Sequence, residues 1–190
     1  ANLYGYSKII MEKMFLEANN EKNIFCCTRF GNVVGSNGSV IPFWLNCKKE
    51  GKSLPLTDLT MTRLMINGNE VSDLIEKCIK EAENKFGGFV LSKFMKKVYL
   101  KDLANHISND IKIVGLRSGE LLSENLISEE ELKFTRIDNN YIFILKNLNE
   151  DKSTQLKEPL SSENAEQMKK NELEELINYV KNKMINTMVY

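Results

Sequence analysis

Apolar residues recur at helical spacing in several stretches of the chain. The pattern is clearest between residues 71 and 82, where they return every three or four positions, as on one face of a helix: Val71, Leu74, Ile75, Cys78, Ile79 and Ala82. A helix is also predicted over residues 40–50, with Ser39 as its N-cap and Gly51 at its end. Further helices are predicted near residues 4–19, 98–107 and 173–180.

Short apolar runs between these helices predict β-strands, at residues 24–28, 54–57, 89–92 and 111–114. Strands that alternate with helices are typical of the α/β class with a largely parallel sheet. Residues 146–170 are polar and rich in Lys, Glu, Asn and Ser, so we expect a loop or mobile segment there.

The composition excludes some functions. Of the 190 residues, 42% are hydrophobic, which is enough for a buried core, and the formal net charge is zero. A neutral chain gives no reason to expect nucleic acid or an anionic membrane as a partner. The four cysteines show no Cys-x-x-Cys spacing, so we expect reduced, mostly buried thiols in a cytoplasmic protein, and no metal site. The single histidine, His106, is expected on a helix surface.

Tyr4 and Lys8 are the first pair of residues that could take part in catalysis. They lie four positions apart in a predicted helix and therefore share a face. A phenol beside an ammonium makes a proton-transfer site, because the ammonium favours the phenolate. The alternative is a surface lysine beside a partly buried tyrosine, since pairs at this spacing also arise by chance.

Glycine and asparagine are concentrated between Arg29 and Ser39, after a predicted strand and before a predicted helix. Glycines let the backbone approach a ligand closely, and a helix N-terminus offers free N–H groups to an anion. Arg63 and Arg117 lie among Gly, Thr and Ser residues, where two guanidinium groups could clamp a diphosphate. Each feature alone also fits a connecting loop or a surface ion pair.

Five stretches in a fixed order resemble one family: NLYGYSK at 2–8, RFGNVVGSNGSVIP at 29–42, LPLTDLTMTR at 54–63, GLRSGELLSE at 115–124 and LSSENA at 160–165. The chain resembles the C-terminal part of an extended short-chain dehydrogenase/reductase of the polysaccharide-biosynthesis type, which includes the inverting UDP-N-acetylglucosamine 4,6-dehydratases. The resemblance implies the C-terminal part of a Rossmann-like parallel sheet plus a small nucleotide-sugar-binding α/β subdomain. Residues 1–110 would hold the Rossmann remnant with interleaved substrate-binding segments, and residues 111–190 the C-terminal substrate-binding segment and helix.

The resemblance also implies an enzyme whose catalytic and cofactor-binding residues are Tyr4 and Lys8. Tyr4 would take the proton of the sugar hydroxyl at carbon 4 as a hydride leaves that carbon. Lys8 would hold the ribose of the nicotinamide cofactor, NADP or NAD. Water would then be lost across carbons 5 and 6, and the hydride would return at carbon 6.

The implied substrate is a UDP-N-acetylhexosamine used in the synthesis of surface polysaccharides or glycans. Asn32 would touch its diphosphate, and Arg63 and Arg117 would neutralise the diphosphate charge. Glu120 would bind the uridine ribose. The complete enzyme is expected to be a homo-oligomer.

Several positions depart from the family pattern. The Gly-x-x-Gly-x-x-Gly phosphate loop and the Thr-Asp-Lys block that serves the elimination step are not in the sequence, so we expect a fragment that is inactive by itself. Relatives often carry Lys and His in the stretch that here reads Leu121-Leu122-Ser123-Glu124. These departures leave alternatives open: a UDP-N-acetylhexosamine 4- or 5-epimerase, a non-catalytic truncated paralogue that binds a nucleotide sugar, or a purely structural α/β domain.

Overall fold

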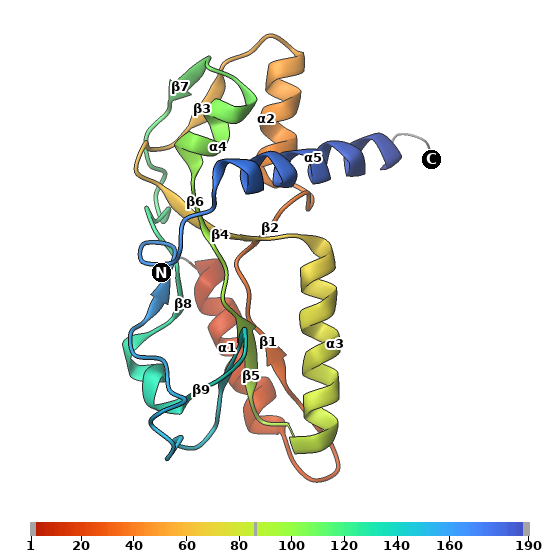
Figure 1. Ribbon diagram of the computed structural model, residues 1–190, viewed down its shortest axis with the longest axis vertical. Helices are drawn as coiled ribbons and strands as arrows, with labels where there is room; N and C mark the ends of the chain where they lie inside the picture. Colours follow the sequence, from red (N-terminus) through yellow and green to blue (C-terminus); the bar gives the residue numbers. More distant parts are fainter. Residues whose placement is uncertain (1–2, 86, 188–190) are drawn as a thin grey trace. The chain divides into compact units, whose positions relative to one another are not determined.

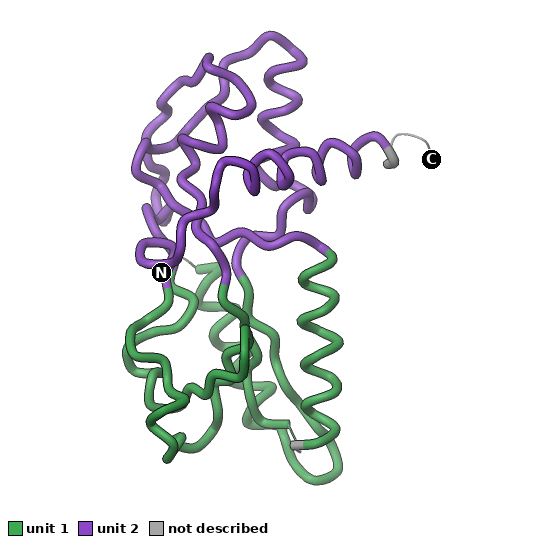
Figure 2. The backbone as a smooth tube through the Cα atoms, in the orientation of Figure 1, with its two compact units in different colours: residues 1–30, 69–94, 125–160 green, residues 31–68, 95–124, 161–190 purple. Residues whose placement is uncertain are grey.

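The computed structural model describes residues 3–85 and 87–187, which fold into two compact units (Figure 2). Each unit is assembled from three separate segments. Unit 1 comprises residues 1–30, 69–94 and 125–160. Unit 2 comprises residues 31–68, 95–124 and 161–190. The segments of the two compact units are therefore interleaved along the chain. Asn2, in the first of the five family-like stretches, lies outside the described residues.

The helices and strands alternate through the first two thirds of the chain (Figure 1). The helices are α1 (Leu3–Ala18), α2 (Val40–Lys49), α3 (Gly68–Lys85), α4 (Leu100–Ile107), α5 (Lys170–Thr187) and the short 3-10 helix η1 (Glu129–Phe134). The strands are β1 (Cys27–Thr28), β2 (Asn32–Val33), β3 (Leu54–Leu56), β4 (Thr62–Ile66), β5 (Val90–Lys93), β6 (Lys97–Tyr99), β7 (Ile111–Ile113), β8 (Asn125–Ile127), β9 (Thr135–Asp138), β10 (Tyr141–Ile144) and β11 (Leu160–Ser161).

Unit 1 is built on a four-stranded sheet in the order β1-β5-β10-β9. Strand β1 runs parallel to β5, whereas β10 runs antiparallel to both β5 and β9. Helix α3 buries Leu74, Cys78 and Ala82 against this sheet, where they join Leu91 and Phe143 in one apolar core. Figure 1 draws α1 and α3 on either side of β1.

Unit 2 combines short strand pairs with three helices. Strand β2 pairs in parallel with β4, β4 pairs in antiparallel with β6, and β3 pairs in parallel with β7. Helices α2, α4 and α5 close the core, in which the Trp44 indole N–H donates to the carbonyl of Pro55 at 2.9 Å. A Cβ at Gly31 would collide with the carbonyl oxygen of Leu64, so glycine at this position allows β2 to approach β4.

The α/β class predicted from the sequence is confirmed, and so are the positions of the main helices. The sheets mix parallel and antiparallel pairs. Residues 98–107 were expected to form one helix, but Val98 and Tyr99 belong to β6 and α4 begins at Leu100. Pairing with β4 overrides helical spacing there, and both side chains favour strands.

Residues 146–170 form a loop over most of their length, as expected, but part of this segment packs into the core. Leu156, Leu160 and Ala165 are buried, and Ser161 belongs to β11. Apolar residues spaced this irregularly give no period, so only the tertiary contacts reveal their burial.

Helix α1 has no buried residue, whereas helices α2, α3, α4 and α5 each bury several. Its apolar side chains are among the most exposed in the described part of the chain, with Leu3 at 88% and Met14 at 66%. Helix α1 is nevertheless attached to unit 1: Phe15 packs on Phe25 with ring centroids 5.7 Å apart. Within the described residues, no helix is both long and apolar enough to cross a membrane.

Candidate functional site

Tyr4 and Lys8 lie side by side on α1, as their spacing predicts. The Lys8 ammonium lies over the Tyr4 ring, 5.4 Å from its centroid. Both side chains are exposed, Tyr4 at 70%, so a ligand can reach the phenol and the ammonium together. The neighbouring Ser7 hydroxyl donates to the Tyr4 carbonyl at 2.7 Å, within the helix turn that separates the two side chains.

An ion cluster anchors the helix that carries this pair. Arg29 Nη2 lies 2.6 Å from Glu12 Oε1 on α1 and 2.8 Å from Glu131 Oε1 on η1. A second hydrogen bond joins Arg29 to each carboxylate, and Arg29 Nη1 also donates to the Leu126 carbonyl at 2.8 Å. The three side chains are only 16–23% exposed, so this planar fork is the polar anchor of an otherwise exposed helix.

The opposite charges in this cluster stabilise one another. Burial alone would raise the pKa of Glu131, but hydrogen bonds and attraction from Arg29 outweigh it and lower that pKa below its ordinary value. Burial alone would lower the pKa of Arg29, but the hydrogen bonds that Arg29 donates to Glu131 and Glu12 outweigh it and raise that pKa. Sequence reasoning missed the cluster because Arg29 and Glu131 are 102 positions apart.

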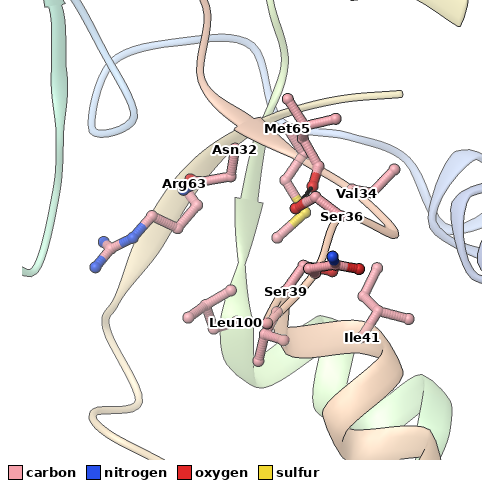
Figure 3. A pocket seen from close by; sticks show the side chains of 12 residues that line it. Asn32, Val34, Ser36, Ser39, Ile41, Arg63, Met65 and Leu100 are labelled. Carbon is pink, nitrogen blue, oxygen red and sulfur yellow. Dashed lines mark hydrogen bonds between the residues drawn. The ribbon is translucent and has the colours of Figure 1, made fainter. Parts of the chain in front are cut away.

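Unit 2 contains a pocket of about 320 Å³ formed around the segment that joins β2 to α2 (Figure 3). Asn32, Ser36 and Ser39 supply polar atoms to its wall, and Met65 and Leu100 supply apolar ones. The segment turns at Gly35 and Gly38, whose positive φ angles of 69° and 76° explain why glycine occupies both positions. The Gly/Asn-rich segment noted in the sequence is therefore the wall of a pocket.

The N-terminus of α2 adds an unusual polar atom to this pocket. Ser39 occupies the N-cap position, as predicted, but its side chain makes no capping hydrogen bond. Its Oγ is buried and has no hydrogen-bond partner among the described residues. A helix N-terminus also leaves backbone N–H groups without intrahelical acceptors. The pocket wall thus offers a serine hydroxyl and helix N–H groups to an anionic ligand.

Arg63 lines the same pocket, but its guanidinium is engaged elsewhere. Nη2 donates to the Leu121 carbonyl at 2.9 Å, and Nε lies 3.2 Å from Glu124 Oε1. Figure 3 draws the guanidinium pointing away from Ser36 and Ser39. In this structure Arg63 therefore holds the end of the loop at residues 115–124, a contact that the sequence did not suggest.

That loop carries the other two predicted substrate residues. Arg117 is exposed, and its backbone N–H donates to Glu120 Oε2 at 2.9 Å. The Glu120 N–H in turn donates to the Arg117 carbonyl at 3.0 Å, which closes a tight turn. Through its bonds to residues 121–124, Arg63 is joined to the loop that presents Arg117.

The predicted site residues fall into both units. Tyr4 and Lys8 belong to unit 1, whereas Asn32, Arg63, Arg117 and Glu120 belong to unit 2. Among the described residues, no group of three or more His, Cys, Asp or Glu side chains is placed to hold a metal ion.

Comparison with curated proteins shows similarity to enzymes that act on nucleotide sugars. The chain is 37% identical over 150 residues to the UDP-N-acetylglucosamine 4,6-dehydratase (inverting) of Campylobacter jejuni subsp. jejuni serotype O:2. It is 34% identical over 140 residues to the UDP-glucose 4-epimerase of Rickettsia rickettsii. These matches cover 75% and 69% of this chain but only 44% and 40% of the relatives, so the chain spans less than half of their length.

Two solved structures share the fold. Pen from Bacillus thuringiensis matches 96% of this chain and 58% of its own length, with a TM-score of 0.80 and 28% identity. The dTDP-glucose 4,6-dehydratase from Bacillus anthracis, solved in complex with NAD, matches 62% of this chain and 41% of its own length, with a TM-score of 0.50 and 21% identity. The family model described as polysaccharide biosynthesis protein matches residues 1–147. The chain belongs to the polysaccharide biosynthesis protein family.

Proposed function

We propose that the complete protein is a nucleotide-sugar 4,6-dehydratase that acts on a UDP-N-acetylhexosamine with a nicotinamide cofactor. The observation that carries the proposal is the exposed Tyr4–Lys8 pair on α1, in which the Lys8 ammonium lies 5.4 Å from the centroid of the Tyr4 ring. The similarity to the inverting dehydratase of Campylobacter jejuni supports this choice of reaction and substrate.

The residues of α1 fit a nicotinamide cofactor in their chemistry. An exposed lysine ammonium has three donors, which suit the hydroxyl groups of a ribose. When bound, the cofactor supplies reversible hydride transfer. Tyr4 contributes the proton transfer: its phenol oxygen would accept the hydroxyl proton at carbon 4. The NAD complex of the Bacillus anthracis dehydratase supports a nicotinamide cofactor. We infer NADP, with NAD as the alternative.

The chemistry of the pocket in unit 2 suits a nucleotide-sugar substrate. A diphosphate is an anion with many acceptor oxygens. The pocket wall offers it the Asn32 amide, the N-terminus of α2 and the Ser39 hydroxyl, which has no hydrogen-bond partner in the described part of the chain. Arg117 would add charge from its exposed loop. Glu120 has a carboxylate that can accept hydrogen bonds from the hydroxyls of the uridine ribose.

Both Arg63 and Arg117 are expected to contribute to substrate binding. In the complete protein, Arg117→Ala should weaken UDP binding by one charge-assisted contact, about 1.5–3 kcal/mol, roughly 10- to 100-fold in Kd. Arg63→Ala should produce a similar loss, measured by titration calorimetry with UDP. Lys112→Ala is the matched control, because Lys112 is an exposed cation on β7 near the same loop.

Glu124→Gln separates two roles of Arg63. If Arg63 acts only by holding the loop, Glu124→Gln should weaken UDP binding as Arg63→Ala does, since it weakens the same contact. If Arg63 contacts the diphosphate, Glu124→Gln should leave binding intact or strengthen it by releasing the guanidinium. Unchanged UDP affinity in both arginine variants would disprove the diphosphate clamp.

The test of the proposed function is incubation of the complete protein and NADP with UDP-N-acetylglucosamine, followed by mass spectrometry. A dehydratase yields a product that has lost one water. A product of unchanged mass but new retention time identifies an epimerase, which the similarity to the Rickettsia rickettsii enzyme makes the second candidate. Tight UDP binding without any product identifies a non-catalytic nucleotide-sugar-binding protein.

A further inference from the structure

Two cysteines outside the proposed site lie in direct contact. Cys26 Sγ and Cys78 Sγ are 3.2 Å apart, although the residues are separated by 52 positions. Cys26 immediately precedes β1 and is half-buried, whereas Cys78 lies in the middle of α3 and is 3% exposed. Both belong to unit 1, where α3 packs its apolar face on the sheet. The fold therefore brings a reachable thiol against a buried one.

We propose that Cys26 and Cys78 form a site of reversible oxidation, at which a peroxide converts the two thiols into an intramolecular disulfide. The Cys26 sulfur attacks one peroxide oxygen, the O–O bond breaks, and Cys26 becomes a sulfenic acid with release of one water. The Cys78 sulfur then attacks the Cys26 sulfur, the S–O bond breaks, and a second water leaves. Two thiols are oxidised to a disulfide, and one hydrogen peroxide is reduced to two waters.

The geometry assigns the order of the two steps. Cys26 is the more exposed of the two residues, so its thiol is expected to meet the oxidant first. Burial, followed by the hydrogen bond that the Cys78 thiol donates to Cys26, raises the pKa of the Cys78 thiol, so Cys78 is a poor first nucleophile in water. It serves as the resolving thiol because the Cys26 sulfur is already within contact distance. Closing the bond requires the sulfurs to approach by about 1 Å, to the ordinary disulfide length.

The other cysteines are excluded as partners by their positions. Cys27 follows Cys26 in extended backbone, so its side chain points to the opposite side of the strand. Burial and the neighbouring Glu12 carboxylate raise the pKa of the Cys27 thiol, which makes it less reactive. Cys47 lies on α2 in the core of unit 2. These two thiols serve as internal controls.

The expected consequence is a more rigid unit 1. The disulfide would tie the strand that leads into Arg29 to helix α3 and close a covalent loop of about 50 residues. Such a loop restricts the unfolded chain, so the oxidised form should melt roughly 5 °C or more above the reduced form.

The test is titration of the reduced 190-residue chain with hydrogen peroxide under native conditions. Free thiols should fall from four to two, and peptide mass spectrometry should find one cross-link, between the peptides of Cys26 and Cys78, that dithiothreitol reverses. Cys27→Ser and Cys47→Ser should behave like the parent chain. Cys26→Ser should abolish both the cross-link and the oxidation-dependent rise in melting temperature.

Three results would overturn the proposal. The first is conversion of Cys26 to sulfinic acid without a cross-link. The second is a cross-link that involves Cys27, Cys47 or a second chain. The third is a cross-link that forms only in denaturant. Cys78→Ala covers the case in which Cys26→Ser fails to fold: in that variant, Cys26 should stop at the sulfenic acid, which dimedone traps.

Discussion

Replacing Tyr4 by phenylalanine in the complete protein is expected to lower turnover by about 100- to 10,000-fold. The phenyl ring keeps its place beside Lys8, but the group that accepts the sugar hydroxyl proton is gone. A hydride cannot leave carbon 4 unless that proton is removed, so the chemical step fails while binding survives. Product formation from UDP-N-acetylglucosamine measures turnover, and calorimetry should give nearly unchanged affinities for UDP and cofactor.

The chain provides a matched control for this substitution. Tyr6 lies on the same exposed helix, at 54% exposure, and Tyr6→Phe removes a hydroxyl of the same kind. It should leave turnover within a factor of a few. Lys8→Ala should lower both turnover and cofactor affinity, because Lys8 is assigned two tasks. Near-normal turnover in Tyr4→Phe would remove the catalytic assignment and leave a tyrosine and a lysine that merely share a helix face.

Local pattern was sufficient to predict much of the fold. The regular apolar spacing from Val71 to Ala82 predicts α3, and Ser39 and Gly51 predict the two ends of α2. Both are local signals, because helical periodicity and helix ends depend on residues close in sequence. The pattern failed where partners are distant. Strand β10 pairs with β5 and β9, and its sequence has no alternating apolar pattern that would identify it as a strand.

The same distinction between local and distant contacts applies to the candidate site. The Tyr4–Lys8 contact follows from helix geometry, and the pocket follows from the glycines that turn the segment before α2. The bonds of Arg63 to the 121–124 loop do not follow from spacing, because only the folded unit brings the two segments together. An arginine in a Gly/Thr/Ser setting can equally hold a ligand or a loop, and the loop is what Arg63 holds here.

Replacing Arg29 by alanine is expected to have the largest effect on stability, a loss of about 3–5 kcal/mol in the free energy of unfolding of unit 1. The substitution leaves Glu12 and Glu131 mostly buried without their shared cation, and α1 loses its polar anchor. Urea denaturation measures the loss, and hydrogen exchange should show faster exchange in α1. Arg136→Ala is the matched control in the same unit, since its guanidinium lies over the Phe143 ring at 4.7 Å and its removal should cost only about 1 kcal/mol.

The pH dependence of the stability loss distinguishes an ionic role of Arg29 from a packing role. The folded-state pKa of Glu131 lies below its ordinary value of 4.5, so its stabilising contribution is present above that pH and is lost as pH falls through the folded pKa. In Arg29→Ala the burial of the Glu131 carboxylate is no longer offset by its main cationic partner, so the variant is penalised at neutral pH and relieved when Glu131 is protonated. The stability difference between parent and Arg29→Ala should therefore be largest near pH 7 and shrink below about pH 4. A difference that stays constant from pH 7 to pH 3 would show that Arg29 contributes packing alone.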